Sequence, residues 1–85
     1  MTIDYSKSFK KSYKKLDLFV REKIKDRIKL FSENKFHTLL NNHSVNPTYD
    51  MGRSINITGD YRAIYVEHEG VVVFIEIGTH SELYK

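Results

Sequence analysis

The 85-residue sequence contains no cysteine, and this absence excludes disulfide bonds, thiolate zinc sites and a cysteine nucleophile. Long apolar runs are also absent: the longest uncharged one, residues 71–75, is far shorter than the roughly 20 residues that cross a bilayer. The first residues lack the apolar stretch of a signal peptide. The single proline and four scattered glycines form no linker, repeat or phosphate-binding loop. We therefore expect one small cytoplasmic domain spanning residues 1–85.

Basic residues are concentrated in the first part of the chain. Residues 1–35 carry 11 Lys and Arg against five Asp and Glu, whereas residues 36–85 carry three against six. A lysine-rich surface of this kind is typical of proteins that bind a polyanion such as RNA. Lysines are also the ordinary solvated residues of helix surfaces, so charge alone leaves both interpretations open.

Apolar periodicity predicts two helices in the first half of the chain. Phe9, Tyr13 and Leu16 recur at helical spacing after Ser6. Five lysines lie around them: Lys7, Lys10, Lys11, Lys14 and Lys15. Asp17 is suited to cap a second helix, whose apolar stripe extends to residue 31. Two helices with so short a connection predict a helical hairpin, preceded by a short strand over residues 2–5.

The second half of the chain predicts an antiparallel sheet. Residues 37–52 are rich in turn-forming residues, with one helical turn expected at 38–40. Alternation over 53–58 and two β-branched runs, 61–67 and 71–77, predict three strands, the last two joined by a hairpin turn.

Gly78 is expected to interrupt the last strand and to leave residues 79–85 as a tail. The resulting order, (β)ααβββ, predicts an α+β fold with the helical hairpin covering one face of the sheet. The other face is expected to stay partly open and to carry the functional site.

The last strand and its tail hold the best candidates for chemistry. The four histidines have spacings that fit no metal motif, so no metal site is expected. A hairpin turning at 68–70 would place Arg62 opposite Glu76, and strand alternation would put His80 on the same face as Val72, Phe74 and Glu76. A fixed cation and a group that transfers protons near neutral pH suit chemistry at a phosphate. A histidine after a strand is nevertheless more often a surface residue, and Arg62 also suits a cross-strand ion pair with Glu76.

Three segments together resemble the RelE/ParE toxin superfamily, and most closely its YafQ-like branch of bacterial type II toxin–antitoxin systems. They are Leu39 to His43, Arg53 to Tyr65 and Ile77 to Tyr84, of which Gly-Asp-Tyr-Arg-Ala-Ile-Tyr and Gly-Thr-His-Ser-Glu-Leu-Tyr are the specific parts. The resemblance covers nearly the whole chain and implies a RelE-like fold. It also implies a ribosome-dependent mRNA endonuclease that needs no cofactor. The partners implied are a cognate antitoxin, the ribosome and mRNA, with operator DNA bound only through the antitoxin complex and no membrane contact.

The resemblance also implies roles for individual residues. His80 matches the histidine proposed as the catalytic acid or base of YafQ-type toxins. Arg62 matches the RelE arginine that holds the scissile phosphate. Asp60 and His43 match further active-site positions, and Tyr84 matches a terminal aromatic residue of these sites.

Contacts to RNA are expected at a second set of positions. The lysines at 7, 10, 11, 14 and 15 would dock on ribosomal RNA. Tyr61, which stands where the YafQ-like branch has an aromatic residue, and Asn56 are also expected to contact RNA. Two positions depart from the pattern: Asn56 replaces a histidine and Glu76 replaces an arginine. These departures bear on catalytic strength rather than on the fold.

The implied reaction is cleavage in the ribosomal A site by attack of a 2′-OH on the adjacent phosphorus. His80 would act as acid or base and Arg62 would stabilise charge, while Asp60, Glu76 or His43 would be the second proton carrier. Two alternatives stay open: a ParE-type inhibitor of gyrase, and a catalytically weak homologue that only binds antitoxin or RNA. Against the gyrase alternative, ParE-type chains lack the pairing of a histidine and an aromatic residue seen here in His80 and Tyr84.

Overall fold

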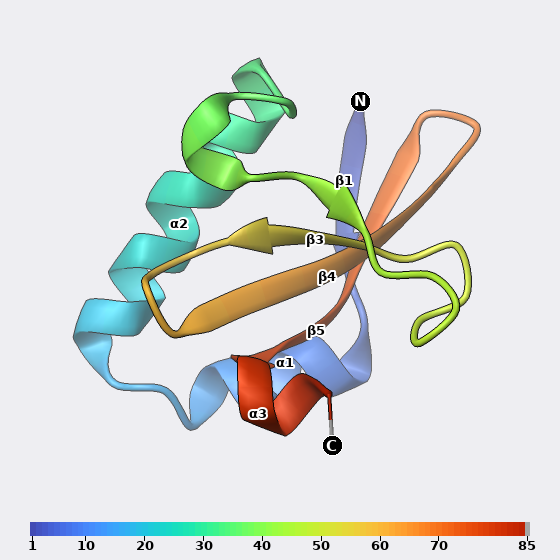
Figure 1. Cartoon of the computed structure of the whole chain (residues 1–85). Helices are drawn as coiled ribbons and strands as arrows, with labels where there is room; N and C mark the ends of the chain where they lie inside the picture. Colours follow the sequence, from blue (N-terminus) through green and yellow to red (C-terminus); the bar gives the residue numbers. More distant parts are fainter. Residues whose placement is uncertain (85) are drawn as a thin grey trace.

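The computed structural model describes residues 1–84. Along the chain lie β1 (Thr2–Tyr5), α1 (Lys7–Lys14), α2 (Leu18–Glu33), the short 3-10 helix η1 (Thr38–Leu40), β2 (His43–Ser44), β3 (Arg53–Asn56), β4 (Tyr61–His68), β5 (Val71–Thr79) and α3 (His80–Leu83). The strands form one five-stranded sheet in the order β1-β5-β4-β3-β2. Helices α1 and α2 pack on one face of this sheet, and α3 lies at its other side (Figure 1). Within the described residues, no helix is long and apolar enough to span a membrane.

The predicted α+β fold is confirmed, but the sheet is mixed and larger than the predicted antiparallel one. β1 pairs in parallel with β5, from Thr2 beside Val71 to Tyr5 beside Phe74. β2 adds two residues at the opposite edge, within the segment that the sequence predicts to be a loop. The sequence does not reveal these pairings, because β1 meets a strand almost 70 residues away and β2 is too short to show alternation.

Side-chain caps begin both long helices as predicted. Ser6 Oγ accepts a hydrogen bond from the backbone N–H of Phe9 at 3.0 Å, and the Asp17 carboxylate accepts one from Val20 at 3.0 Å. Each cap of this kind stabilises its helix by about 1 kcal/mol, because it satisfies an N–H that has no partner within the helix.

The main apolar core lies between the helices and the sheet, with Phe74 of β5 at its centre. The Phe74 ring centroid lies 6.0 Å from that of Phe9, 5.4 Å from that of Phe31 and 5.6 Å from that of Tyr65. The buried members are Phe9, Val20, Ile24, Phe31, Leu40, Ile55, Ile57, Ala63, Tyr65, Val72, Phe74 and Ile77. This core joins both helices to β3, β4 and β5, so it holds the sheet as a rigid base for the other face.

A second, smaller apolar cluster covers part of the sheet face opposite α1 and α2, here called the outer face. Its buried members are Val45, Ile64 and Leu83, with Tyr49, Ile75 and Tyr84 packed around them. These residues come from the 45–52 loop, the sheet and the C-terminal segment. The outer face is therefore partly open, as predicted, with α3 and one loop covering the remainder.

A β-bulge in β5 changes which residue lies opposite Arg62. The ladder between β4 and β5 shifts by one residue between Ile64 and Tyr65, so that Ile75 has no paired residue in β4. The turn pairs His68 with Val71 and accounts for one residue of displacement, and the bulge accounts for the second, so Arg62 lies opposite Gly78 rather than opposite residue 76. The register predicted from a simple hairpin was wrong by two residues.

The bulge also changes the faces on which side chains lie. Val72 and Phe74 are buried in the helix-side core, whereas Glu76 pairs with Ile64 of the outer-face cluster. The prediction that His80 shares one face with residues 72 and 74 was therefore wrong. The alternative ion pair between Arg62 and Glu76 does not form, because Arg62 lies opposite Gly78 and its guanidinium bonds to the β3–β4 turn. The Glu76 carboxylate instead accepts a 2.6 Å hydrogen bond from Ser8 of α1.

Candidate active site

The segment after β5 is a helix that starts at the sheet edge, and this places His80. β5 continues through Gly78 to Thr79, so the predicted interruption at Gly78 was wrong, and the predicted tail is helical over His80–Leu83. The Thr79 and Glu82 side chains form a reciprocal capping box, with hydrogen bonds of 3.2 Å and 2.8 Å. The His80 N–H donates to the Asp60 carbonyl at 3.3 Å, which holds His80 beside the β3–β4 turn.

Gly78 allows α3 to fold back onto the outer face. A β-carbon at this position would lie 3.2 Å from Glu82 Oε1 and 3.5 Å from Leu83 Cδ2. Position 78 is therefore a close-approach point between β5 and α3, and not a strand breaker.

We expect Gly78→Val to lower the free energy of unfolding by about 1–3 kcal/mol, because a branched side chain would displace α3 and expose Leu83. Urea denaturation measures this change. Gly59→Val is the matched control for stability, since a β-carbon at Gly59 meets nothing within 4 Å, and its effect should stay within about 0.5 kcal/mol. Equal destabilisation by the two variants would contradict the role of Gly78.

His80 faces an open hollow and lies against an aromatic ring. The hollow has a volume of about 450 Å³ and is lined by Gly59, Asp60, Tyr61, Thr79, His80 and Ser81. The imidazole and the Tyr84 ring have centroids 4.6 Å apart, and the Tyr84 N–H donates to the His80 carbonyl at 3.0 Å. His80 and Asp60 are both exposed, so a polyanionic substrate can reach both side chains.

Arg62 lies on the same face, between Asn56 of β3 and Gly78 of β5. Its Nη1 donates to the carbonyls of Thr58 at 2.8 Å and Tyr61 at 2.9 Å, which ties the guanidinium to the β3–β4 turn. An arginine has five N–H donors, and those on Nε and Nη2 bond to no side chain or carbonyl among residues 1–84. A held guanidinium with unused donors suits a phosphate.

Asn56 carries an acceptor that is unused within the described part of the chain. Its Oδ1 is buried and has no hydrogen-bond partner there. Because Asn56 pairs with Arg62 across β3 and β4, this acceptor lies in the same row as the guanidinium.

His43 of β2 is the second histidine on this side of the molecule. It is exposed and pairs with Ser54, which pairs in turn with Ile64 of the outer face. Its Nδ1 lies 2.7 Å from the Asn41 carbonyl. Because a carbonyl only accepts, Nδ1 carries the hydrogen and the neutral ring presents Nε2 as an acceptor.

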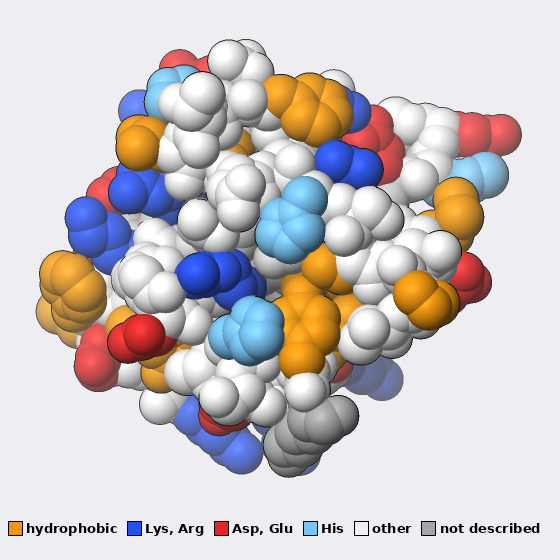
Figure 2. Space-filling model, in the orientation of Figure 1, with side chains coloured by type: hydrophobic (Ala, Val, Ile, Leu, Met, Phe, Trp, Pro, Cys, Tyr) orange, Lys and Arg blue, Asp and Glu red, His pale blue; other side chains and the backbone are white. Residues whose placement is uncertain are grey.

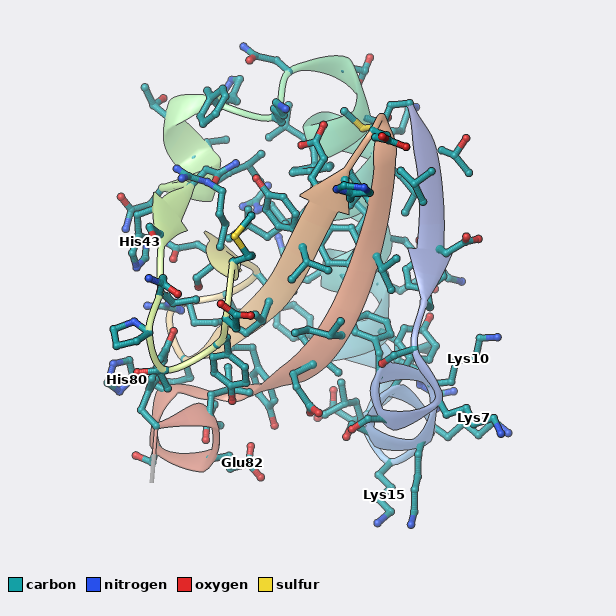
Figure 3. The ribbon with its side chains drawn as sticks, turned by 90° about the vertical axis from the view of Figure 1, so that its right-hand side faces the viewer. Lys7, Lys10, Lys15, His43, His80 and Glu82 are labelled. Atoms are coloured by element: carbon teal, nitrogen blue, oxygen red, sulfur yellow. The ribbon has the colours of Figure 1, made fainter. Side chains whose placement is uncertain are left out.

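The figures show how these groups gather. His43 and His80 project at the same side of the molecule (Figure 3). Two histidine side chains lie near the centre of the view in Figure 2, with a basic side chain beside them. The structure therefore brings His43, Asp60, Arg62, His80 and Tyr84 to one side, and no group of three potential metal ligands occurs among residues 1–84.

The comparison with protein families gives one match over the whole chain. A family model described as the bacterial toxin of type II toxin–antitoxin systems, YafQ, matches residues 1–85. The chain belongs to the YafQ toxin family. No curated protein matched its sequence.

Solved structures share the fold of this YafQ-family toxin at low sequence identity. YafQ from E. coli strain BL21(DE3) is 21% identical, with a TM-score of 0.77 over 98% of this chain and 97% of that one. A YoeB/ParE toxin from Agrobacterium tumefaciens is also 21% identical, with a TM-score of 0.77 over 94% and 99%. A chain of the RelB–RelE antitoxin–toxin complex from Methanococcus jannaschii is 18% identical, with a TM-score of 0.75 over 95% and 94%. The RelE-like fold expected from the sequence is thus confirmed.

Among the other candidate residues of the YafQ-family toxin, the labelled lysines lie away from His80 and Tyr61 lies near it. Lys7 and Lys10 of α1, and Lys15 directly after it, project at the opposite side of the molecule from the two histidines (Figure 3). Tyr61 lines the hollow but is half-buried and packs against the helix-side core.

Between α1 and α2 the YafQ-family toxin has an apolar groove of about 660 Å³. Its lining residues are Tyr5, Phe9, Lys10, Tyr13, Lys14, Ile24, Lys25, Ile28 and Lys29. Aromatic and aliphatic side chains thus alternate with four lysines, and no carboxylate is among the lining residues. The sequence predicts the two helices and their lysines, but not that the helices leave a groove between them.

Tyr49 is the residue of this toxin's site that the sequence analysis missed. Its hydroxyl donates to the Leu83 carbonyl at 2.7 Å, and its ring meets the Tyr84 ring edge-on with centroids 6.1 Å apart. Burial, followed by the charges of Glu76 and Tyr84, raises the pKa of the Tyr49 phenol above its usual value. The only signal in the sequence is a single aromatic residue in the polar 46–50 turn.

Proposed function

We propose that this toxin is a ribosome-dependent mRNA endonuclease that acts as one domain, residues 1–85, in the bacterial cytoplasm. The observation that carries the proposal is the position of His80, exposed in an open hollow beside Asp60, against Tyr84 and next to the β4 strand that carries Arg62. Membership of the YafQ family and the resemblance of the site motifs support the same reaction.

The reaction proposed is attack of the RNA 2′-OH on the adjacent phosphorus, with departure of the 5′-oxygen. A base removes the 2′ proton, an acid protonates the leaving oxygen, and a cation stabilises the charge that develops on the phosphorane oxygens. The products are a 2′,3′-cyclic phosphate and a 5′-OH. The free Nε and Nη2 donors of Arg62 suit the phosphorane.

Proton transfer is assigned to His80 and one partner. His80 is the proposed acid, held by the Tyr84 ring on one side and open to the hollow on the other. His43, with Nε2 as an acceptor, and Asp60, in the hollow itself, are the two candidates for the base. Glu76 has no role in this proposal, because its carboxylate bonds to Ser8 of α1 and does not line the hollow that holds His80.

An exposed site of this kind cannot hold a flexible RNA in line by itself. Each proton carrier contributes about 10²- to 10⁴-fold in rate, whereas positioning of the reacting groups contributes about 7–11 kcal/mol. A ribosome that holds the mRNA in its A site supplies this positioning, which gives ribosome dependence a physical reason.

The ends of the products test the reaction type. Cleavage of labelled mRNA on ribosomes should leave a 2′,3′-cyclic phosphate that phosphatase removes only after acid opening. Products with a 5′-phosphate would contradict 2′-OH attack. Intact mRNA together with inhibited gyrase supercoiling would replace the proposal by the ParE-type alternative.

Ribosome docking is proposed for the lysines in and directly after α1 that do not line the groove. Lys7, Lys11 and Lys15 are exposed and recur every four residues, so they share one side of the helix. Replacing all three by Gln should weaken ribosome binding and reduce the slope of log affinity against log salt by about two units. Filter binding at several salt concentrations measures this slope. An unchanged slope would contradict the docking role, and Lys23→Gln on α2 is the control for loss of a single remote charge.

The α1–α2 groove is proposed as the binding site of a cognate antitoxin. An amphipathic helix with one apolar face and acidic flanks complements an apolar floor bordered by four lysines. Related toxins are known in complex with antitoxins, as in the DinJ–YafQ and RelB–RelE structures. Because Lys10 and Lys14 border the groove and Lys7 and Lys11 lie within one helical turn of them, an antitoxin bound here would also hinder docking of α1 on the ribosome.

A further inference from the structure

We infer that Tyr49 is a positioning residue for the cleavage site: through its contacts with Leu83 and Tyr84 it holds the Tyr84 ring against His80. The inference rests on the proposed nuclease function for its catalytic consequence, but its structural part can be tested independently. Tyr49 belongs to the 45–52 loop, which is distant in sequence from the segment it contacts.

The contacts form a continuous chain from the loop to the imidazole. The Tyr49 hydroxyl donates to the Leu83 carbonyl at 2.7 Å, and the Tyr49 and Tyr84 rings pack edge-on at 6.1 Å. The Tyr84 ring then lies 4.6 Å from the imidazole of His80. Tyr49 therefore contacts the Leu83 backbone and the Tyr84 ring, and both contacts hold the Tyr84 ring beside His80.

α3 needs such a contact because it is only four residues long. A helix of this length is unstable alone, and its last carbonyls have no partner within the helix. The capping box of Thr79 and Glu82 stabilises its first turn. At its C-terminal end, Tyr49 satisfies the Leu83 carbonyl and packs beside Leu83, which is buried in the outer-face cluster.

Backbone hydrogen bonds within the 45–52 loop fix the position of Tyr49. The Tyr49 N–H donates to the Val45 carbonyl at 3.1 Å, and the Gly52 N–H donates to the Tyr49 carbonyl at 2.7 Å. A β-carbon at Gly52 would lie 2.6 Å from Tyr49 Cβ, so only glycine fits this approach.

The variant Tyr49→Phe tests the inference, because it removes the hydroxyl and keeps the ring. Single-turnover cleavage on ribosomes should show a rate at saturating toxin about tenfold lower, with half-saturation within about twofold of the wild type. In NMR spectra of the free protein, the His80 ring protons should move toward the positions of an unstacked imidazole. Tyr65→Phe is the matched control: it removes a phenol that accepts a 2.7 Å hydrogen bond from Asn42 on the helix side, and should leave both readouts unchanged.

The two readouts separate failure of the inference from failure of the proposed function. Unchanged His80 ring-proton shifts in Tyr49→Phe would overturn the inference whether or not the toxin cleaves RNA. Changed shifts with an unchanged saturated rate would overturn the catalytic part. If the wild type cleaves nothing while the shifts change as expected, the proposed nuclease function fails and Tyr49 stands only as the residue that positions Tyr84 against His80.

Discussion

Replacing His80 by alanine should lower the rate of mRNA cleavage about 10²- to 10⁴-fold, the contribution expected of one proton carrier. The side chain is exposed in the hollow and lies against the tilted ring of Tyr84, while the backbone N–H of His80 donates to the Asp60 carbonyl. Its loss should therefore leave the fold intact. Single-turnover cleavage on programmed ribosomes measures the rate, and thermal unfolding verifies the fold.

His68→Ala is the matched control for this result. His68 is an exposed histidine at the β4–β5 turn, and its only charged neighbour among residues 1–84 is Glu69, with 3.8 Å between Nε2 and Oε1. This control should cleave mRNA at the rate of the wild type. A His80→Ala variant as active as His68→Ala would remove His80 from the mechanism and favour His43 or Asp60 as the principal group.

The double substitution Lys10→Glu, Lys14→Glu should weaken antitoxin binding about 10²- to 10³-fold. Both lysines border the α1–α2 groove, and reversing their charge turns attraction for an acidic helix into repulsion while leaving the apolar floor of the groove in place. Calorimetric titration of the toxin with its cognate antitoxin gives the two dissociation constants.

The matched control is Lys7→Glu, Lys11→Glu, which makes the same charge change on lysines of the same helix that do not line the groove. With a screening length of about 8 Å at about 0.15 M salt, this control should lose several-fold less antitoxin affinity than the groove variant. Equal losses in the two double variants would mean that the antitoxin senses overall charge rather than the groove. Full affinity in the groove variant would place the antitoxin elsewhere.

The elements of the fold were predictable wherever a strong local pattern exists. Apolar periodicity and the capping residue Asp17 predict α2, and the turn at 68–70 predicts the β4–β5 hairpin. The bulge at Ile75 could not be predicted from the sequence. Residues 71–75 are apolar at every position, so they show no alternation of apolar and polar residues that an extra residue would interrupt. The parallel pairing of β1 depends on non-local contacts with β5 that no local pattern encodes.

The candidate site was likewise predictable only where local sequence patterns exist. The sequence is enough to select His80, Arg62 and Asp60 as candidates. Each of them flanks a predicted turn or strand end, and these ends lie next to one another in the predicted hairpin. Tyr49 could not, since its role depends on the 45–52 loop folding over the outer face and meeting Leu83. The groove between α1 and α2 likewise depends on how the two helices diverge on the sheet, which their sequences do not specify.

The most direct test of the proposed function is primer extension on an mRNA translated in vitro, with the wild-type toxin and with ribosomes present or withheld. The account predicts new 5′ ends inside codons at the A site, which appear only when ribosomes are present. Intact mRNA in the presence of active toxin and translating ribosomes, or the same cuts without ribosomes, would contradict it.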